Sequence, residues 1–241
     1  MRLSAPVHRL KHQARLLSRR EGIPLHAALD RIAAAEGFAS WSLLAARLNR
    51  EAGEGGTAAT AFARLVPGDL LLLAARPGQG KTLMGLRLAV EAMKAGRTSA
   101  FFSLEYTERD ILDRFRAIGV SPAAFADRFT FDSADGICAG YMVERLADAQ
   151  AGTLAVIDYL QLLDQRRDTP PLAQQVATLS AFARRRGLIL VFLSQIDRRY
   201  DPSSRACPDL GDIRLPNPVD LSLFGKTCFL NGGEMRFQAS A

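Results

Sequence analysis

The chain has 241 residues, of which 48% are hydrophobic and 23% charged, the composition of a soluble globular protein. No stretch approaches the ~20 consecutive apolar residues that cross a bilayer, and the charges near the start exclude a secretory signal peptide. The three cysteines, Cys138, Cys207 and Cys228, form no CxxC pair, which argues against a zinc site and fits a reducing compartment. We therefore expect a cytoplasmic protein without membrane contact.

The net charge of +6 is concentrated in the first 50 residues, which hold nine basic and three acidic side chains. Apolar residues recur every three or four positions from Leu3 to Leu17, which predicts an amphipathic helix. Lys11, Arg15 and Arg19 fall together on another face of that helix. This basic face is a candidate nucleic-acid contact. A solvated arginine-rich helix explains the same pattern, so both interpretations stay open.

Two more short helices complete a predicted basic helical module over residues 1–50. One follows Pro24, and the next begins at Ser40 as N-cap and contains the only tryptophan. The residues of the second helix expected to face inward are Ala27, Ala28, Ile32 and Ala35. A helix-turn-helix and an ordinary helical bundle both fit. The glycine-rich residues 51–61 are expected to be a flexible linker to a second domain, residues 62–241.

The second domain alternates short apolar runs with helical stretches, which is typical of an α/β fold. Its predicted strands cover residues 69–75, 98–105, 128–133, 154–163 and 188–195. Its predicted helices cover residues 81–96, 107–119, 137–152 and 172–187. A final hairpin over residues 221–238 is predicted to turn at Asn231-Gly232-Gly233. This order predicts a mostly parallel sheet with helices on both faces.

The sequence ARPGQGKT, residues 75–82, lies between a predicted strand and a predicted helix, as a phosphate-binding loop requires. Its glycines let backbone N–H groups point at phosphate oxygens, and the helix that follows adds the positive end of its dipole. Lys81 is expected to neutralise the β- and γ-phosphates, and the hydroxyl of Thr82 to bind Mg²⁺. The residues expected to bind the nucleotide are Arg76, Pro77, Gly78, Gln79, Gly80, Lys81, Thr82 and Leu83. Ala75 stands where the usual pattern has glycine, but a small residue suffices at a strand end.

Polar residues stand at the ends of three other predicted strands, at the sheet edge where α/β proteins bind ligands. Asp158 is placed to hold Mg²⁺ through water, and Glu105 to activate a water for attack on the γ-phosphate. Gln195 is placed to contact the γ-phosphate and pass its state to the next loop. Each residue alone would also fit an ordinary solvated strand end.

Together the stretches AARPGQGKT, FFSLE, VIDYLQLL and VFLSQIDRR resemble the ATPase domain of DnaB-type replicative helicases, a branch of the RecA-like P-loop proteins. The resemblance covers about residues 62–238. It implies a RecA-like fold that binds ATP and Mg²⁺, with Glu105, Lys81 and Gln195 acting in catalysis and Asp158 as the second metal acid. Even Ala75 agrees, since the loop of that family commonly begins with alanine.

The same resemblance implies partners. It favours single-stranded DNA as a ligand and a homo-oligomer whose ATP site lies between subunits. Arg198 and Arg199 fall in the loop that leads towards DNA, so they are candidate phosphate contacts or simply exposed loop charges.

The chain departs from the family pattern in ways that keep other functions open. The usual large N-terminal domain is replaced by a net-basic segment of about 50 residues, and the segment after Asp158 is short. Lys226 and Arg236 of the last hairpin do not match the spacing of the residues that reach a neighbouring subunit's γ-phosphate. We expect a DNA-dependent ATPase or helicase-like motor. The alternatives are a nucleotide-gated protein-interaction switch with slow or no hydrolysis, and a small-molecule kinase, which the lack of a lid-like helix pair disfavours.

Overall fold

The computed structural model describes residues 4–5, 7–41, 43–44, 57–160, 163, 169–201, 205, 207–215 and 217–239. The chain divides into two compact units, one of Met1–Thr57 with Gly232–Glu234 and the other of Ala58–Asn231 with Met235–Ala241. The predicted domain boundaries stay predictions, and residues 51–56 of the predicted linker lie outside the described residues. A short helix, α4 (Ala58–Phe62), forms where the end of that linker was expected. Its Ala61 is buried, and this burial favours helix over a flexible chain.

The N-terminal unit contains α1 (Val7–Glu21) and α2 (Leu25–Ala35), close to the two helices predicted there. Among its described residues, the buried hydrophobic side chains are Leu10, Ala14, Ala28, Ala33 and Leu44. Ala28 is buried as predicted, but Ala35 is exposed and Ala33 is buried instead. The reason is that Ala35 ends α2, where a side chain has fewer neighbours than within the helix. Ser40 accepts a hydrogen bond from the N–H of Leu43 (3.3 Å), as an N-cap does.

The second unit is built on a sheet that contains seven strands within the described residues. The strands are β1 (Leu70–Ala75), β2 (Ser99–Ser103), β3 (Phe129–Asp132), β4 (Leu154–Asp158), β5 (Ile189–Gln195), β6 (Lys226–Asn231) and β7 (Glu234–Ala239). Their order across the sheet is β3-β2-β4-β5-β1-β6-β7. The pairs β1–β5, β1–β6, β2–β3, β2–β4 and β4–β5 are parallel. All predicted strands are therefore present, although β4 ends at Asp158, before the predicted residue 163.

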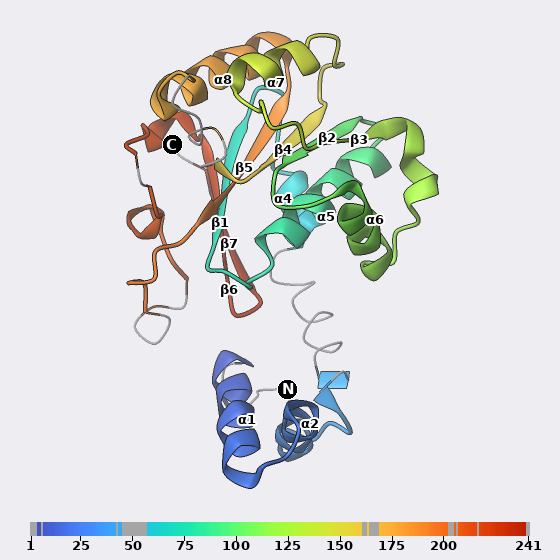
Figure 1. The fold of residues 1–241 in the computed structure, drawn as a ribbon, viewed down its shortest axis with the longest axis vertical. Helices are drawn as coiled ribbons and strands as arrows, with labels where there is room; N and C mark the ends of the chain where they lie inside the picture. Colours follow the sequence, from blue (N-terminus) through green and yellow to red (C-terminus); the bar gives the residue numbers. More distant parts are fainter. Residues whose placement is uncertain are drawn as a thin grey trace. The chain divides into compact units, whose positions relative to one another are not determined.

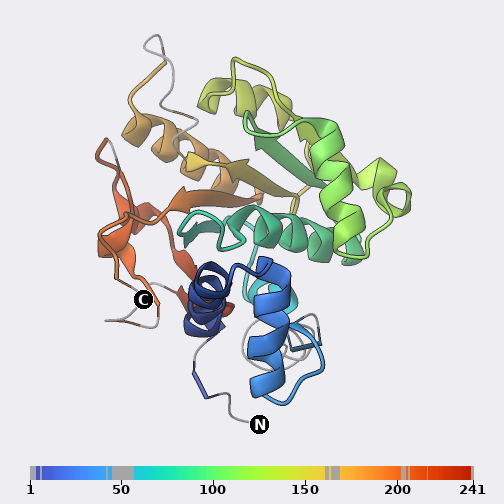
Figure 2. The same cartoon turned by 60° about the horizontal axis from the view of Figure 1, so that its bottom comes forward.

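Helices cover both faces of this sheet (Figures 1 and 2). They are α4, α5 (Lys81–Lys94), α6 (Glu108–Ala117), α7 (Ala139–Arg145) and α8 (Leu172–Arg186). The helices α7 and α8 share one hydrophobic cluster with the sheet, and α4, α5 and α6 share the other. The central strands are buried on both sides, which explains why their sequences are continuously apolar. The predicted α/β architecture is thus confirmed, with α7 shorter than its predicted range.

Helix α6 begins with a Thr-x-x-Asp capping box. The side chain of Thr107 accepts a hydrogen bond from the N–H of Asp110, and the side chain of Asp110 accepts one from the N–H of Thr107. None of the helices among the described residues is long and apolar enough to span a bilayer.

Helix α5 lies very close to the sheet at Gly85. A Cβ atom at this position would stand 3.0 Å from Cγ1 of Val156 and 3.3 Å from a methyl of Leu193. We expect Gly85→Val to lower the free energy of unfolding by about 1–3 kcal/mol, because the added methyl groups overpack this contact. Urea denaturation measures the change. Gly140→Val is the control, since Gly140 is an exposed helical glycine. A Cβ atom added there would be 4.0 Å from its nearest neighbour, Sγ of Cys138. Equal losses for the two variants would contradict the expectation.

Candidate nucleotide-binding site

The loop between β1 and α5 has the backbone that its glycines permit. Gly78 and Gly80 adopt φ values of +75° and +86°, in the left-handed region that favours glycine. Gly80 is the N-cap of α5, so the helix dipole directs its positive end at the loop. Ala75 is the last residue of β1, fully buried and paired with Gln195 of β5. Alanine at this position therefore belongs to the strand and leaves the loop geometry intact.

The side chain of Asp158 connects the end of β4 to the glycine loop and the start of α5. It ends β4, and its side chain is completely buried. One carboxylate oxygen accepts a hydrogen bond from Nζ of Lys81 (2.8 Å), and the other accepts one from Oγ1 of Thr82 (2.7 Å). The acid predicted to serve the metal thus contacts both loop residues predicted to serve phosphate and metal. A hydroxyl and a carboxylate are the hard oxygen ligands that Mg²⁺ prefers.

A pocket of about 550 Å³ opens at this edge of the sheet. Its lining residues are Pro77, Gly78, Gly80, Lys81, Thr82, Leu83, Glu105, Tyr106, Arg114, Tyr159 and Gln195. Six of the eight predicted loop residues are among them, together with the predicted Glu105 and Gln195. Arg76 and Gln79 are not among the lining residues. The N–H of Gln79 donates to the carbonyl of Arg76 (3.1 Å), so these two residues close the turn.

Glu105 and Gln195 reach the pocket from two different strands. Glu105 follows β2, is exposed, and donates its N–H to Oγ of Ser103 (3.1 Å). Gln195 is the last residue of β5 and is half-buried. An exposed carboxylate can take a proton from a water, and an amide side chain can contact a phosphate oxygen.

Three lining residues were not predicted: Tyr106, Arg114 and Tyr159. The guanidinium of Arg114 lies 4.3 Å from the ring centroid of Tyr106. Nζ of Lys81 lies 5.5 Å from that of Tyr159. Each tyrosine directly follows a predicted acid, so its position in the sequence was a usable signal. Arg114 had none, because only the packing of α6 brings it to the pocket.

Arg198 and Arg199 lie outside the pocket lining, on the exposed chain that follows β5. Nε of Arg199 is 3.2 Å from a carboxylate oxygen of Asp197, which also accepts the N–H of Arg199 (2.8 Å). Both hydrogen bonds lower the pKa of Asp197, and the one from the backbone N–H has the larger effect. Arg198 and Arg199 therefore present a basic surface next to an acid that stays ionised.

Lys11, Arg15 and Arg19 are all exposed on α1, in the N-terminal unit. Their spacing places them on one helix face, as predicted, and leaves them accessible to an anionic ligand.

Lys226 is engaged within its own chain. Its Nζ is 2.8 Å from Oδ2 of Asp69 and also donates to the carbonyl of Arg64, and the side chain is only 17% exposed. It is therefore unsuited to reach a neighbouring subunit. Arg236 of β7 is exposed.

We expect Lys226→Met to lower the free energy of unfolding by about 1–3 kcal/mol, because the partly buried Asp69 loses its cation. Any nucleotide turnover at the pocket should stay at the wild-type rate, because Lys226 is not among the residues that line it. Thermal unfolding and a phosphate-release assay measure the two effects. Lys94→Met is the control, since the side chain of Lys94 is 58% exposed in its pair with Glu91. A large fall in turnover without loss of stability would show that Lys226 acts in catalysis.

Comparison with protein families matches residues 60–121 to the DnaB-like helicase C-terminal domain. This stretch contains the loop, Glu105 and Arg114. The replicative DNA helicase DnaB of Synechocystis sp. is 28% identical over 177 residues, covering 61% of this chain and 20% of that protein. The DnaB of Mycoplasma genitalium is 24% identical over 197 residues, covering 66% of this chain and 42% of the relative. The chain thus spans less than half the length of these curated relatives.

Two solved structures share the fold. A structure of a DnaB-like replicative helicase and its interactions with primase superposes with a TM-score of 0.57 at 17% identity, covering 68% of this chain and 48% of that one. A second structure, of an ATPase domain, superposes with a TM-score of 0.54 at 19% identity, covering 78% of this chain and 81% of that one. The predicted RecA-like fold is confirmed.

Proposed function

We propose that this chain, which carries a DnaB-like helicase C-terminal domain and is a distant homologue of the replicative DnaB helicases, binds ATP with Mg²⁺ and hydrolyses it. One observation carries the proposal. The glycine loop, Glu105 and Gln195 line a single pocket, and Asp158 joins Lys81 to Thr82 directly beside it.

Each group has a chemical role in this reaction. The loop amides and Lys81 hold the phosphates and offset their charge. Thr82 and Asp158 would hold Mg²⁺, which supplies charge neutralisation when bound. Among the described residues no group of three or more His, Cys, Asp or Glu side chains could hold a metal, so nucleotide oxygens would complete its shell. Glu105 orients a water and accepts its proton as the oxygen attacks the γ-phosphorus, and the bond from this phosphorus to the bridging oxygen breaks so that ADP leaves. Gln195 contacts a γ-phosphate oxygen during this step.

The aromatic side of the pocket suits the nucleoside. The rings of Tyr106 and Tyr159 and the flat guanidinium of Arg114 offer surfaces for stacking with a base. Such surfaces favour a nucleotide over a simple phosphate ester.

The proposal extends to DNA as the ligand that stimulates hydrolysis. It is supported by the exposed Arg198 and Arg199, which follow the γ-phosphate contact Gln195, and by the basic face of α1. ATP turnover should rise when single-stranded DNA is added, and DNA affinity should fall steeply with salt. An oligomer with its ATP site between subunits is part of the same proposal, and mass measurements with and without ATP and DNA test it.

Charge-removal variants separate the two basic surfaces. The variants to be compared are Arg198→Gln/Arg199→Gln and Lys11→Gln/Arg15→Gln/Arg19→Gln. The measurements are DNA binding and DNA-stimulated ATP turnover. Arg184→Gln/Arg185→Gln, at the exposed end of α8, removes two charges elsewhere. No DNA binding by the wild type at low salt, with or without ATP, would refute a DNA-dependent ATPase.

A nucleotide-gated protein switch with slow hydrolysis is the second candidate. The engagement of Lys226 by Asp69 favours this function, because it keeps Lys226 away from a γ-phosphate. A cation supplied to the γ-phosphate can accelerate hydrolysis by ~10³-fold or more, so hydrolysis without it would be slow. Nucleotide-dependent capture of a protein partner, with turnover indifferent to DNA, would select this function.

A further inference from the structure

The main chain around Gln195 is held from two sides. The N–H of Ile196 donates to the carbonyl of Ala75 (3.0 Å), where the phosphate loop begins. The carbonyl of Gln195 accepts the N–H of Arg214 (2.8 Å), from a stretch of chain that returns to this edge. The position of the Gln195 side chain therefore depends on the returning stretch as well as on the sheet.

The returning stretch, residues 209–214, pairs with the start of the loop after β5. Ile213 forms an antiparallel bridge with Ile196, and the carbonyl of Asp212 accepts the N–H of Asp197 (2.7 Å). Both isoleucines are buried in the core. A shift of Asp212 would thus move the partner of the residues directly after Gln195.

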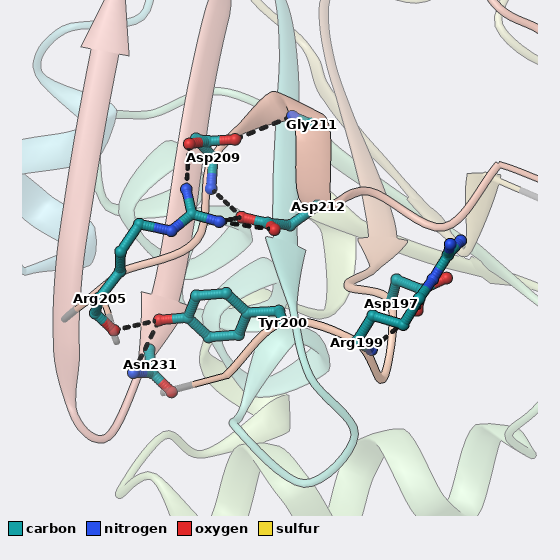
Figure 3. Close-up of polar contacts among 8 residues, drawn as sticks. All are labelled: Asp197, Arg199, Tyr200, Arg205, Asp209, Gly211, Asp212 and Asn231. Carbon is teal, nitrogen blue, oxygen red and sulfur yellow. Dashed lines mark hydrogen bonds and ion pairs between the residues drawn. The ribbon is translucent and has the colours of Figure 1, made fainter. Parts of the chain in front are cut away.

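Arg205 holds Asp212 through its side chain (Figure 3). Nη2 of Arg205 donates to both carboxylate oxygens of Asp212 (2.8 and 2.9 Å), and Nη1 donates to Asp209. The carboxylates also cap the backbone, because Asp212 accepts the N–H of Asp209 (2.9 Å) and Asp209 that of Gly211 (2.9 Å). These three side chains form one unit, which we call the Arg205 clamp: Arg205, Asp209 and Asp212.

Tyr200 anchors the clamp to the sheet. Its ring is buried, and its hydroxyl donates to the carbonyl of Arg205 (2.7 Å) and accepts from Asn231 at the end of β6 (3.4 Å). The N–H of Tyr200 donates to the carbonyl of Asp197 (3.2 Å). Burial raises the pKa of Tyr200, so the hydroxyl keeps its proton and remains a donor. The Arg205 backbone is thereby fixed, which lets its side chain act on Asp212.

We propose that Arg205 is a positioning residue for the nucleotide reaction. Through Asp209 and Asp212 it holds the returning stretch, and with it the main chain that presents Gln195 to the γ-phosphate. The inference rests on the proposed ATP hydrolysis. Both terminal nitrogens of Arg205 are occupied by carboxylates, whereas Arg199 points away from this cluster in Figure 3. The two arginines therefore differ in role: Arg205 holds the returning stretch, and Arg199 takes no part in the clamp.

Arg205→Met tests the inference, with Arg205→Lys as the conservative variant. Arg116→Met is the matched control, because Arg116 pairs with Asp113 (2.6 Å) and both are exposed on α6. The quantities to be measured are amide hydrogen exchange over residues 195–200 and 209–215, the Kd for ATP, and kcat. Exchange is recorded without nucleotide, with ADP, and with a non-hydrolysable ATP analogue.

In Arg205→Met we expect exchange in both segments to rise by about tenfold or more, since charge-assisted bonds are lost. We expect kcat to fall by about tenfold to 100-fold with little change in Kd. Arg205→Lys should retain part of the amide protection and part of kcat, because one ammonium replaces the planar fork of arginine only incompletely. In the wild type the ATP analogue should protect the two segments more than ADP does, and this difference should disappear in Arg205→Met.

Two outcomes would overturn the inference. Exchange equal to that of Arg116→Met would mean that the clamp does not hold the returning stretch. Faster exchange with unchanged kcat would mean that the hold does not position Gln195. If the wild type binds no ATP, the proposed function fails, and exchange without nucleotide still decides whether Arg205 holds the stretch.

Discussion

Glu105→Gln is expected to lower ATP turnover by about 10³-fold while leaving ATP affinity nearly unchanged. Glutamine keeps the size of the side chain at the pocket but cannot accept a proton from the attacking water. Glu105 is exposed and makes its hydrogen bond to Ser103 through the backbone N–H, so the change removes no buried contact. Single-turnover hydrolysis together with equilibrium binding of a fluorescent ATP analogue measures both quantities.

Glu108→Gln is the matched control for this variant. Glu108 lies in the first turn of α6, is exposed, and is not among the lining residues of the nucleotide pocket. Its turnover should equal that of the wild type. Equal turnover for Glu105→Gln and Glu108→Gln would remove Glu105 from the mechanism and favour the slow-switch alternative.

Lys81→Met is expected to abolish ATP binding and to destabilise the fold as well. In the proposed function this lysine is the cation for the β- and γ-phosphates, and in the structure it is the ion-pair partner of the completely buried Asp158. Its removal leaves the carboxylate with the hydroxyl of Thr82 but without a cation. Breaking a buried pair in this way costs about 3–5 kcal/mol. Urea denaturation and nucleotide binding report the two effects separately.

The double variant Lys81→Met/Asp158→Asn separates stability from function. Removing the carboxylate charge should recover part of the lost free energy of unfolding, since no unpaired charge is left buried. It should recover no ATP binding. Lys94→Met, near the end of the same helix, should match the wild type in both measurements. ATP binding retained by Lys81→Met would contradict the assignment of the phosphate loop.

Local patterns in the sequence were sufficient for the α/β architecture and most of the pocket. Strand-length apolar runs predict buried strands because a parallel sheet covered on both faces has no polar side. The loop could be placed because glycines with positive φ have a recognisable spacing between strand and helix. Glu105, Asp158 and Gln195 could be grouped because parallel strands end at a common edge. The helix at residues 58–61 was not predicted from the sequence, which placed these residues in the linker. Short stretches of alanine and threonine are helical only when they pack against a surface.

What the sequence determined by itself is therefore the set of residue types at this place: a glycine-rich loop with acids and an amide at one sheet edge. What only the tertiary structure decided is which side chains meet there. Asp158 bonds to Lys81 across 77 positions of sequence, α6 brings Arg114 to the pocket, and Asp69 engages Lys226. The physical reason is that periodicity and turn chemistry are local, whereas such pairs depend on the register of distant strands and on the packing of helices against them.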